Sequence, residues 1–372
     1  MAFTGLARLG RALLMASAVI VPAATAAMAD DDPIVAEAKA NVIKNGGPQN
    51  VWDGPTSSFP PMPGKRIAFM SLDEQNDASR LWGQATKEAG ERAGWEVVVI
   101  DGRGSPKTWI EGMNQAIALK VDGIVTTADI ASMQEPVKAA NEAGIVVMGI
   151  HGWAYPGPNK DLGVWYNVQQ DPKEIGEAQA DWIIAHSDGK ARVVVTSHCE
   201  FQIACEKAHA TEARIKECKG CEVLEFSSTP ISEAAQRQPA LVSAWVQKYG
   251  TPLYITSVAD YTADFQVPPL RAGGVAPDEV ILVSADGNRS AYERIRAGDQ
   301  YQMVTVSEPP PLQGYQVIDE FNRAFHGQPP SGWHQRPYLV TPDNVNAEGG
   351  DQNRFIPSNG FAERYAEMWG VK

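Results

Sequence analysis

The stretch RIAFMSLDEQNDASRLWGQATKEAGERAGWEVVVID, residues 66–101, decides the fold. It opens with a short apolar run, Ile67–Met70, which ends in a polar loop rich in carboxylates, Ser71–Asp77. A helical pattern follows, and a second apolar run, Val97–Ile100, closes at Asp101. This order predicts a β-loop-α-β unit with its loop at the carboxyl end of the first strand. Ligands bind at that edge of open α/β sheets, so the loop is a candidate binding segment.

The same alternation continues along the chain. Short apolar runs predict strands at residues 67–70, 97–100, 123–125, 145–150, 193–196, 222–226, 253–257, 280–283 and 303–306. Stretches with helical spacing lie between most of them, and one helical face carries Ala78, Leu81, Trp82, Ala85 and Ala89. Strands bounded by helices predict a mainly parallel sheet covered on both faces. Right-handed crossovers then give doubly wound lobes.

The alternation loosens at residues 152–171, GWAYPGPNKDLGVWYNVQQD, a long aromatic segment with several Pro and Gly residues. A second series of strand and helix patterns begins after it. One sheet rarely takes so many strands without splitting, so we predict two lobes, with the chain crossing near residues 165–170. Residues 327–372 are rich in Pro, Gly and Asn and end in a helical run at 360–368. We expect this last part to pack across both lobes.

The first residues have the pattern of an export signal. Arg8 and Arg11 precede an apolar stretch from Ala12 to Ala24, and Ala27-Met28-Ala29 is a small-x-small cleavage site. We interpret residues 1–29 as a secretory signal peptide, removed in the mature protein. The alternative, a membrane anchor, is disfavoured because the apolar run is short and rich in alanine. Residues 30–64 hold a short helical piece and a Pro-rich run, and are interpreted as an appendage or linker.

The composition is acidic. The 372-residue chain has a net charge of −13. Loss of Arg8 and Arg11 with the signal leaves 30 basic against 45 acidic side chains, a net charge of −15. Such a surface argues against nucleic acid and anionic membranes as partners. We expect a protein that binds neither.

Four cysteines cluster at Cys199, Cys205, Cys218 and Cys221. Four thiolates could hold zinc, and Cys218-Lys-Gly-Cys221 has a suitable spacing for half of such a site. The same C-x-x-C pair could be a redox motif. In an exported protein, structural disulfides are favoured over both. We predict the pairs Cys199–Cys205 and Cys218–Cys221, because both close short loops, although sequence leaves other pairings open.

Motifs for several kinds of catalysis are missing. The chain has no G-x-x-x-x-G-K-[ST] phosphate loop, and no G-x-G-x-x-G follows the first strand. The HExxH pair and the G-x-S-x-G elbow are also absent. The six histidines are scattered without ligand-like spacing. We therefore predict neither an enzyme nor a metal or cofactor site.

Polar side chains follow the ends of the predicted strands in both halves of the chain. In parallel sheets these residues converge on one crevice. Carboxylates there accept hydroxyl hydrogen bonds, and charged acceptors make the stronger ones. Aromatic faces cover the C–H faces of a sugar ring, and a cationic amine would also suit the acids. The candidate ligand-binding residues are Asp73, Glu74, Asn76, Thr127, Asp129, His151, Trp153, Asp260, Tyr261, Asp286 and Glu308.

Several of these residues have a second explanation. Asp77, Asp129 and Asp171 each precede a helical pattern by a few residues, where Asp caps the helix. Trp82 and Trp109 lie on apolar helical faces and are interpreted as core. Trp153 and Trp165, in the segment between the lobes, are better candidates for stacking on a ligand.

Taken together, the motifs resemble those of the type I periplasmic substrate-binding proteins of the ribose-binding kind, which serve ABC sugar importers. The resemblance covers residues 65–340. It rests on RIAFMS with GQATKEAGERAGWEVVVID, on VDGIVTT, on PVKAANEAGIVVMGI, and on VILVSADGN followed by IRAGDQYQMVTVSEPPPLQGYQVI. The family implies two flavodoxin-like lobes joined by a three-segment hinge, with the ligand between them.

Only part of the family's ligand-binding set carries over. The polar residue after the first strand falls near Asn76, and the Asp after the eighth strand is Asp286. The family's aromatic stackers are replaced by Ala78-Ser79-Arg80, and its Asp-Arg pair falls on His151-Gly152. Its second-lobe arginine falls near Cys205, and its hinge glutamine falls on Glu308. These departures imply a small ligand other than ribose.

The resemblance leads to a complete set of expectations. We expect one lobe from residues 65–168 and 309–338, and a second from 169–308, with 339–372 as an extension of the second. The predicted function is that of a monomeric periplasmic protein that captures a monosaccharide or polyol and delivers it to the permease of an ABC importer. A sensor that presents the ligand to a membrane receptor is one alternative. Another is a hydrolase or lyase that uses His151 with Asp286 or Glu308.

Overall fold

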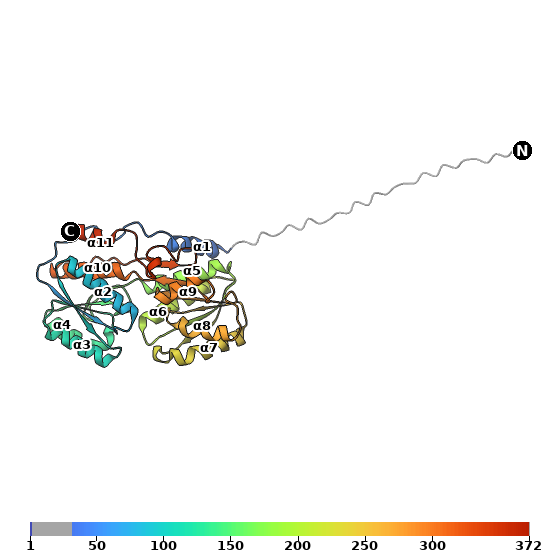
Figure 1. Cartoon of the computed structure of the whole chain (residues 1–372), viewed down its shortest axis with the longest axis horizontal. Coiled ribbons are helices and arrows are strands. Elements are labelled where there is room, and N and C mark those ends of the chain that lie inside the picture. The colour runs from blue at the N-terminus through green and yellow to red at the C-terminus, as the bar shows by residue number, and fades with distance from the viewer. Residues whose placement is uncertain (2–31, 372) are drawn as a thin grey trace. The chain divides into compact units, whose positions relative to one another are not determined.

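The computed structural model describes Met1 and residues 32–371, which fold into two lobes, each built on a six-stranded sheet (Figure 1). The proposed signal peptide, apart from Met1, lies outside the described residues. The predicted fold class, two doubly wound α/β lobes, is confirmed.

The first sheet has the strand order β2-β1-β3-β4-β6-β5, with five parallel strands and an antiparallel edge strand, β5. Its strands are β1 (Arg66–Ser71), β2 (Glu96–Asp101), β3 (Gly123–Thr126), β4 (Val146–Ile150), β5 (Gly157–Asn159) and β6 (Val164–Val168). One face of this sheet is covered by α2 (Asp77–Arg92) and α10 (Pro310–Phe325). The other face is covered by α3 (Pro106–Ala118) and α4 (Gln134–Glu142).

The second sheet has the order β8-β7-β9-β10-β11-β12, with β12 antiparallel. Its strands are β7 (Arg192–Ser197), β8 (Glu222–Ser228), β9 (Leu253–Thr256), β10 (Val280–Asp286), β11 (Gln302–Ser307) and β12 (Tyr338–Val340). Its helices are α5 (Pro172–His186), α6 (Gln202–Glu217), α7 (Ala234–Tyr249), α8 (Thr262–Ala272) and α9 (Arg289–Ala297). Figure 1 shows these five helices grouped around this sheet.

The continuous apolar runs are explained by burial on both faces of each sheet. Successive side chains of a strand point to opposite faces. In β7, Val193 and Val195 belong to the cluster under α5 and α6, whereas Val194 packs with α7 and α8. Likewise, Phe69 of β1 lies in one core cluster of the first lobe and Met70 in the other. A strand with two apolar environments needs no polar face, which is why these strands could be predicted.

All nine predicted strands are present, and three further strands were missed. Two of them, β5 and β6, lie in the segment 152–171 that was interpreted as a connection between lobes. Gly157, Pro158 and Asn159 form β5, and such residues normally indicate a turn. Strand β6 joins the first sheet beside β4, so the chain leaves the first lobe only after Val168.

The chain passes between the two sheets at residues 169–171, 308–309 and 326–337, which gives the expected three-segment hinge. Gln170 fastens the three segments together. Its Nε2 donates to the carbonyl oxygen of Ser307 at 3.0 Å and to that of Arg336 at 3.1 Å. One buried amide therefore joins its own hinge segment to the third and to the end of β11, which leads into the second.

Both ends of the described chain pack against the lobes. Helix α1 (Pro33–Gly46) contributes Ile34 and Ala38 to the core of the second lobe. Helix α11 (Phe361–Trp369) packs in the first-lobe core, and the Trp369 indole Nε1 donates to the buried Asp319 at 2.8 Å. The sequence prediction had grouped residues 339–372 with the second lobe. We propose a revised boundary in which residues 361–369 belong to the first.

Candidate functional site

A cavity of about 300 Å³ lies between the lobes, at the carboxyl ends of strands from both sheets. This is within the size range of small-molecule sites. Its polar residues come from the loops after β1, β3 and β4 in the first lobe and after β7, β9 and β10 in the second. Of the predicted residues, the cavity brings together Asn76, Thr127, Asp129, His151, Trp153, Tyr261 and Asp286.

Side-chain hydrogen bonds hold the first-lobe wall of the cavity in place. Asn76 caps α2, because its Oδ1 accepts from the Ser79 amide at 3.0 Å. The Thr127 hydroxyl accepts from the Leu72 amide at 2.7 Å and shares a hydrogen with the Ser79 hydroxyl at 2.6 Å. Burial raises the pKa of Asp129, the acid of this wall. The wall therefore presents hydroxyl and amide groups on a fixed backbone.

An aromatic pair closes the side of the cavity near the hinge. The His151 ring lies 4.8 Å from the Trp82 ring, centroid to centroid, with a tilt of 41°. Trp82 is 6% exposed, and its Nε1 donates to Gln313 Oε1 on α10. Trp82 is a core residue, as interpreted from sequence, and also lines the cavity. His151 stands where the family that the sequence resembles has an aspartate. This side of the cavity therefore offers a ring face instead of a carboxylate.

His151 is paired with the buried Glu308. The two side chains approach to 3.1 Å between Nε2 and Oε1, and the other carboxylate oxygen accepts from Gln313 Nε2 at 2.6 Å. Burial is the largest effect on Glu308 and opposes its ionisation. The charges of His151 and Lys207 and the hydrogen bonds together outweigh it, so the pKa of Glu308 is lowered. Glu308 does not line this cavity but a second, adjoining one.

Asp286 is held by Lys207, a residue that sequence reasoning did not find. Lys207 lies on α6, is 4% exposed, and its Nζ is 3.0 Å from Asp286 Oδ1. Burial alone would lower the pKa of Lys207, but the charges of Asp286 and Glu308 raise it above its ordinary value. Among the described residues, Asp286 Oδ2 has no hydrogen-bond partner, so one oxygen remains free to accept from a ligand.

The opposite wall contains a histidine, His198, with hydrogen-bond contacts at both ring nitrogens. His198 Nδ1 lies 2.6 Å from the Thr229 carbonyl oxygen, so Nδ1 carries the hydrogen and donates. Nε2 lies 2.6 Å from the Tyr261 hydroxyl oxygen, within hydrogen-bond distance. The two rings also stack, with centroids 5.4 Å apart. His198 and Tyr261 thus form a polar wall of aromatic rings.

Besides Glu308, three predicted residues do not line the cavity. Asp73 accepts from the Gln75 amide within its own turn, and the Glu74 amide donates to Asp101. Asp260 is fully buried and accepts hydrogen bonds from Ser284, Gly287, Asn288, Gln302 and Thr305. It supports the loop that carries Asp286. Burial, followed by the charge of Asp286, raises the pKa of Asp260 to about 6.

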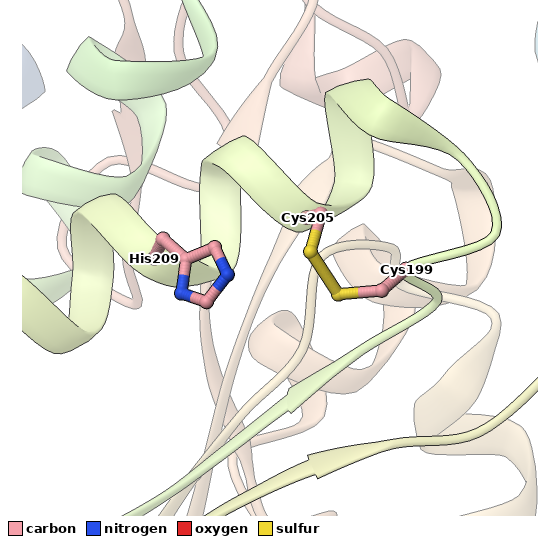
Figure 2. Close-up of side chains that lie close together, drawn as sticks. All are labelled: Cys199, Cys205 and His209. Atoms are coloured by element: carbon pink, nitrogen blue, oxygen red, sulfur yellow. A yellow bond between two sulfur atoms is a disulfide. The ribbon is translucent and has the colours of Figure 1, made fainter.

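Both predicted disulfides are present, Cys199–Cys205 and Cys218–Cys221. The first closes the loop that ends β7 and begins α6, and Glu200, Phe201 and Gln202 of this loop line the cavity. Figure 2 shows His209 one turn along α6 from Cys205. The ligand atoms of Cys199, Cys205 and His209 lie within 4.8 Å of one another, but the two sulfurs are bonded together and offer no thiolate.

Some residues of the cavity were not predicted from the sequence, and they differ in how clearly the sequence indicates them. Lys207 lies within the helix 202–217 and shows no local pattern that indicates burial. Phe201 follows a predicted strand and could have been included on that ground. Trp165, the second stacking candidate of the segment between the lobes, packs beside Tyr166 and does not line the cavity.

Two doubly wound lobes, a three-segment hinge and a cavity between them define a two-lobed solute-binding protein. The chain matches the family model of the periplasmic binding protein domain over residues 67–329 and belongs to that family. No curated protein sequence matches the chain. Among the described residues, no helix has the length and apolarity needed to cross a membrane.

Solved structures share the fold at low sequence identity. The arabinose-transporter binding protein of Shewanella sp. ANA-3, bound to L-arabinofuranose, is 16% identical with a TM-score of 0.66, over 78% of this chain and 96% of that one. A solute-binding protein of Agrobacterium vitis bound with α-D-tagatopyranose is 15% identical with a TM-score of 0.68, over 78% and 99%. Another from A. vitis, with allitol, is 21% identical with a TM-score of 0.64, over 76% and 97%.

Proposed function

We propose that the protein captures a monosaccharide or polyol between its lobes and delivers it to the permease of an ABC importer. The observation that carries the proposal is the cavity lined by strand-end residues of both lobes. The ligands named for the similar structures, arabinofuranose, tagatopyranose and allitol, support the same ligand class.

The cavity residues suit a ligand with several hydroxyl groups. Asp286 Oδ2 is a charged acceptor without a protein partner among the described residues, and such acceptors make strong hydrogen bonds to hydroxyls. Thr127 and Asn76 add neutral polar groups. The Trp82 ring offers an apolar face to the C–H groups of a ring or chain. The charge of Asp286 is already paired with Lys207, which favours an uncharged ligand here.

Capture would be coupled to lobe closure. A ligand that contacts both walls binds the closed state better than the open state, and only this difference in affinity can shift the equilibrium. The hinge segments 169–171, 308–309 and 326–337 are the positions where the backbone would bend.

A thermal-shift screen against pentoses, hexoses, polyols and sugar acids tests the function, followed by calorimetry on each hit. Asp286→Asn should weaken the hit by about tenfold or more, because a charge-assisted hydrogen bond is lost. Asp278→Asn, an exposed carboxylate on a turn outside the cavity, is the matched control and should leave affinity unchanged. Equal affinity in both variants would place the ligand elsewhere.

We further propose that the protein acts in the periplasm, as a monomer, and that residues 1–29 are removed on export. Mass spectrometry of the exported protein should then give an N-terminus at Asp30. Binding without chemistry is part of the same proposal. Mass spectrometry of the hit solute after incubation should return it unchanged, and an altered product would favour the hydrolase or lyase alternative.

A further inference from the structure

A second cavity, of about 310 Å³, adjoins the first between the lobes. The two share Ala78, Trp82 and Asp286 in their linings, so they are neighbouring parts of one cleft. The linings differ in charge. The second contains three arginines, Arg80, Arg289 and Arg354, whereas the first contains none.

Each acid of the second cavity lies beside a basic side chain. Asp77 pairs with Arg80 at 2.6 Å. Asp286 pairs with Lys207, and Glu308 Oε1 lies 3.1 Å from His151 Nε2. Two arginines are left over, Arg289 at the start of α9 and Arg354 in the segment before α11. Neither forms an ion pair with any residue that the structure describes.

Arg354 in addition has an unsatisfied donor. Its Nε is buried and has no hydrogen-bond partner, while one terminal nitrogen donates to Gln352 Oε1 at 2.7 Å. Buried donors in folded proteins are normally paired, and an exception needs an explanation. A bound acceptor in the cavity would supply one.

The segment that carries Arg354 is fixed in place. Arg296 of α9 donates to Asn346 Oδ1 at 2.8 Å, to Asn353 Oδ1 at 2.8 Å and to the Gly350 carbonyl oxygen at 2.6 Å. These three bonds tie residues 346–353 to the helix that begins with Arg289. The two unneutralised guanidinium groups are therefore mounted on one assembly of the second lobe, and Arg80 lies across from them on α2 of the first lobe.

We propose that the second cavity binds a small oxyanion, a phosphate or carboxylate group, through Arg289 and Arg354. Guanidinium groups bind such oxyanions through paired N–H donors. In a chain with a net charge of −13, an anion needs a local excess of positive charge to bind, and these two side chains supply it. The anion is either free in solution or carried by the solute that occupies the first cavity.

The test is a titration of the mature protein with inorganic phosphate at constant ionic strength, followed by tryptophan fluorescence, since Trp82 lines both cavities. Arg289→Gln and Arg354→Gln should each weaken phosphate binding by about tenfold or more. Arg364→Gln, an exposed arginine of α11 outside both cavities, should bind phosphate like the wild type. Asp286→Asn should strengthen phosphate binding, because it removes a negative charge from the lining.

A second arm compares a hexose with the corresponding hexose 6-phosphate. If the anion is carried by the solute, the phosphorylated sugar binds more tightly than the sugar, and both arginine variants remove that advantage. If the anion is free, phosphate alone binds and the sugar phosphate has no advantage. Absence of binding in both arms would overturn the proposal, as would unchanged anion binding in the two arginine variants. A neutral solute that still binds these variants would leave the proposed function intact.

Discussion

Loss of the Asp286 charge should destabilise the protein without any ligand present. In Asp286→Asn the buried Lys207 ammonium loses its nearest counter-ion, which lies 3.0 Å away. Removal of one partner of a buried pair costs about 3–5 kcal/mol. The cost should be lower here, about 2 kcal/mol, because the amide oxygen can still accept from Lys207 and because Glu308 lies nearby. Asparagine also tolerates the positive φ of +96° at this position.

This free energy converts into a small shift in melting temperature. The unfolding entropy of about 2.1 cal/mol/K per residue, over the described residues 32–371, makes 2 kcal/mol equivalent to about 3 °C. Urea unfolding at pH 7, followed by tryptophan fluorescence, measures the free energy itself, provided that the slope with urea is unchanged.

A double-mutant cycle isolates the pair. Lys207→Met should cost about 1 kcal/mol, since the Asp286 side chain is 24% exposed and can be solvated by water. The double variant should then cost little more than Lys207→Met alone. If the double variant costs the sum of the two single variants, within about 0.5 kcal/mol, the two charges are not coupled and the reasoning is refuted.

Three further predictions concern the cavity and the buried acids. Trp82→Leu removes the ring under His151 and should weaken the solute found by the screen by about tenfold, measured by calorimetry; unchanged affinity would exclude contact with Trp82. The double variant C199S/C205S should lose about 2 kcal/mol of stability together with solute affinity, whereas C218S/C221S should lose a similar stability and keep its affinity; equal affinities would show that the first disulfide does not shape the cavity wall. Burial raises the pKa of Glu320 from 4.5 to about 7, so the folded protein keeps this proton at pH values where the unfolded chain has lost it. The free energy of unfolding of the wild type should therefore fall as the pH rises from 4.5 to 7. Glu320→Gln should remove the part of that loss that belongs to Glu320, up to about 3 kcal/mol in urea unfolding, and leave the part that belongs to Asp260; parallel pH profiles for the two proteins would contradict the assignment.

The strands were predictable wherever both faces of the sheet are covered. Val193–Val195 has apolar neighbours on either side, so its sequence shows the environment directly. Strand β6 has the sequence VWYNV and follows Pro and Gly residues, and only its pairing with β4 makes it a strand. The position of α11 depends on contacts with α10, and no local pattern encodes which lobe a terminal helix joins.

The sequence was enough to predict which loops converge on the candidate site. It was not enough to predict which side chains of those loops point into the cavity. Asp286 and Asp260 both follow strands of the second sheet. Asp286 faces the cavity, whereas Asp260 turns under its loop to accept five hydrogen bonds. Lys207 belongs to the candidate site because its side chain donates a hydrogen bond to Asp286, which is 79 positions later in the chain. Such long-range pairing leaves no trace in local sequence spacing.

The central claim is that a solute bound between the lobes draws them together, and small-angle X-ray scattering of the mature protein tests it most directly. Scattering should be recorded with and without a saturating concentration of the solute identified by the screen. We predict that the radius of gyration decreases with solute in the wild type and in Asp278→Asn. A tightly bound solute that leaves the radius of gyration unchanged would contradict capture between the lobes.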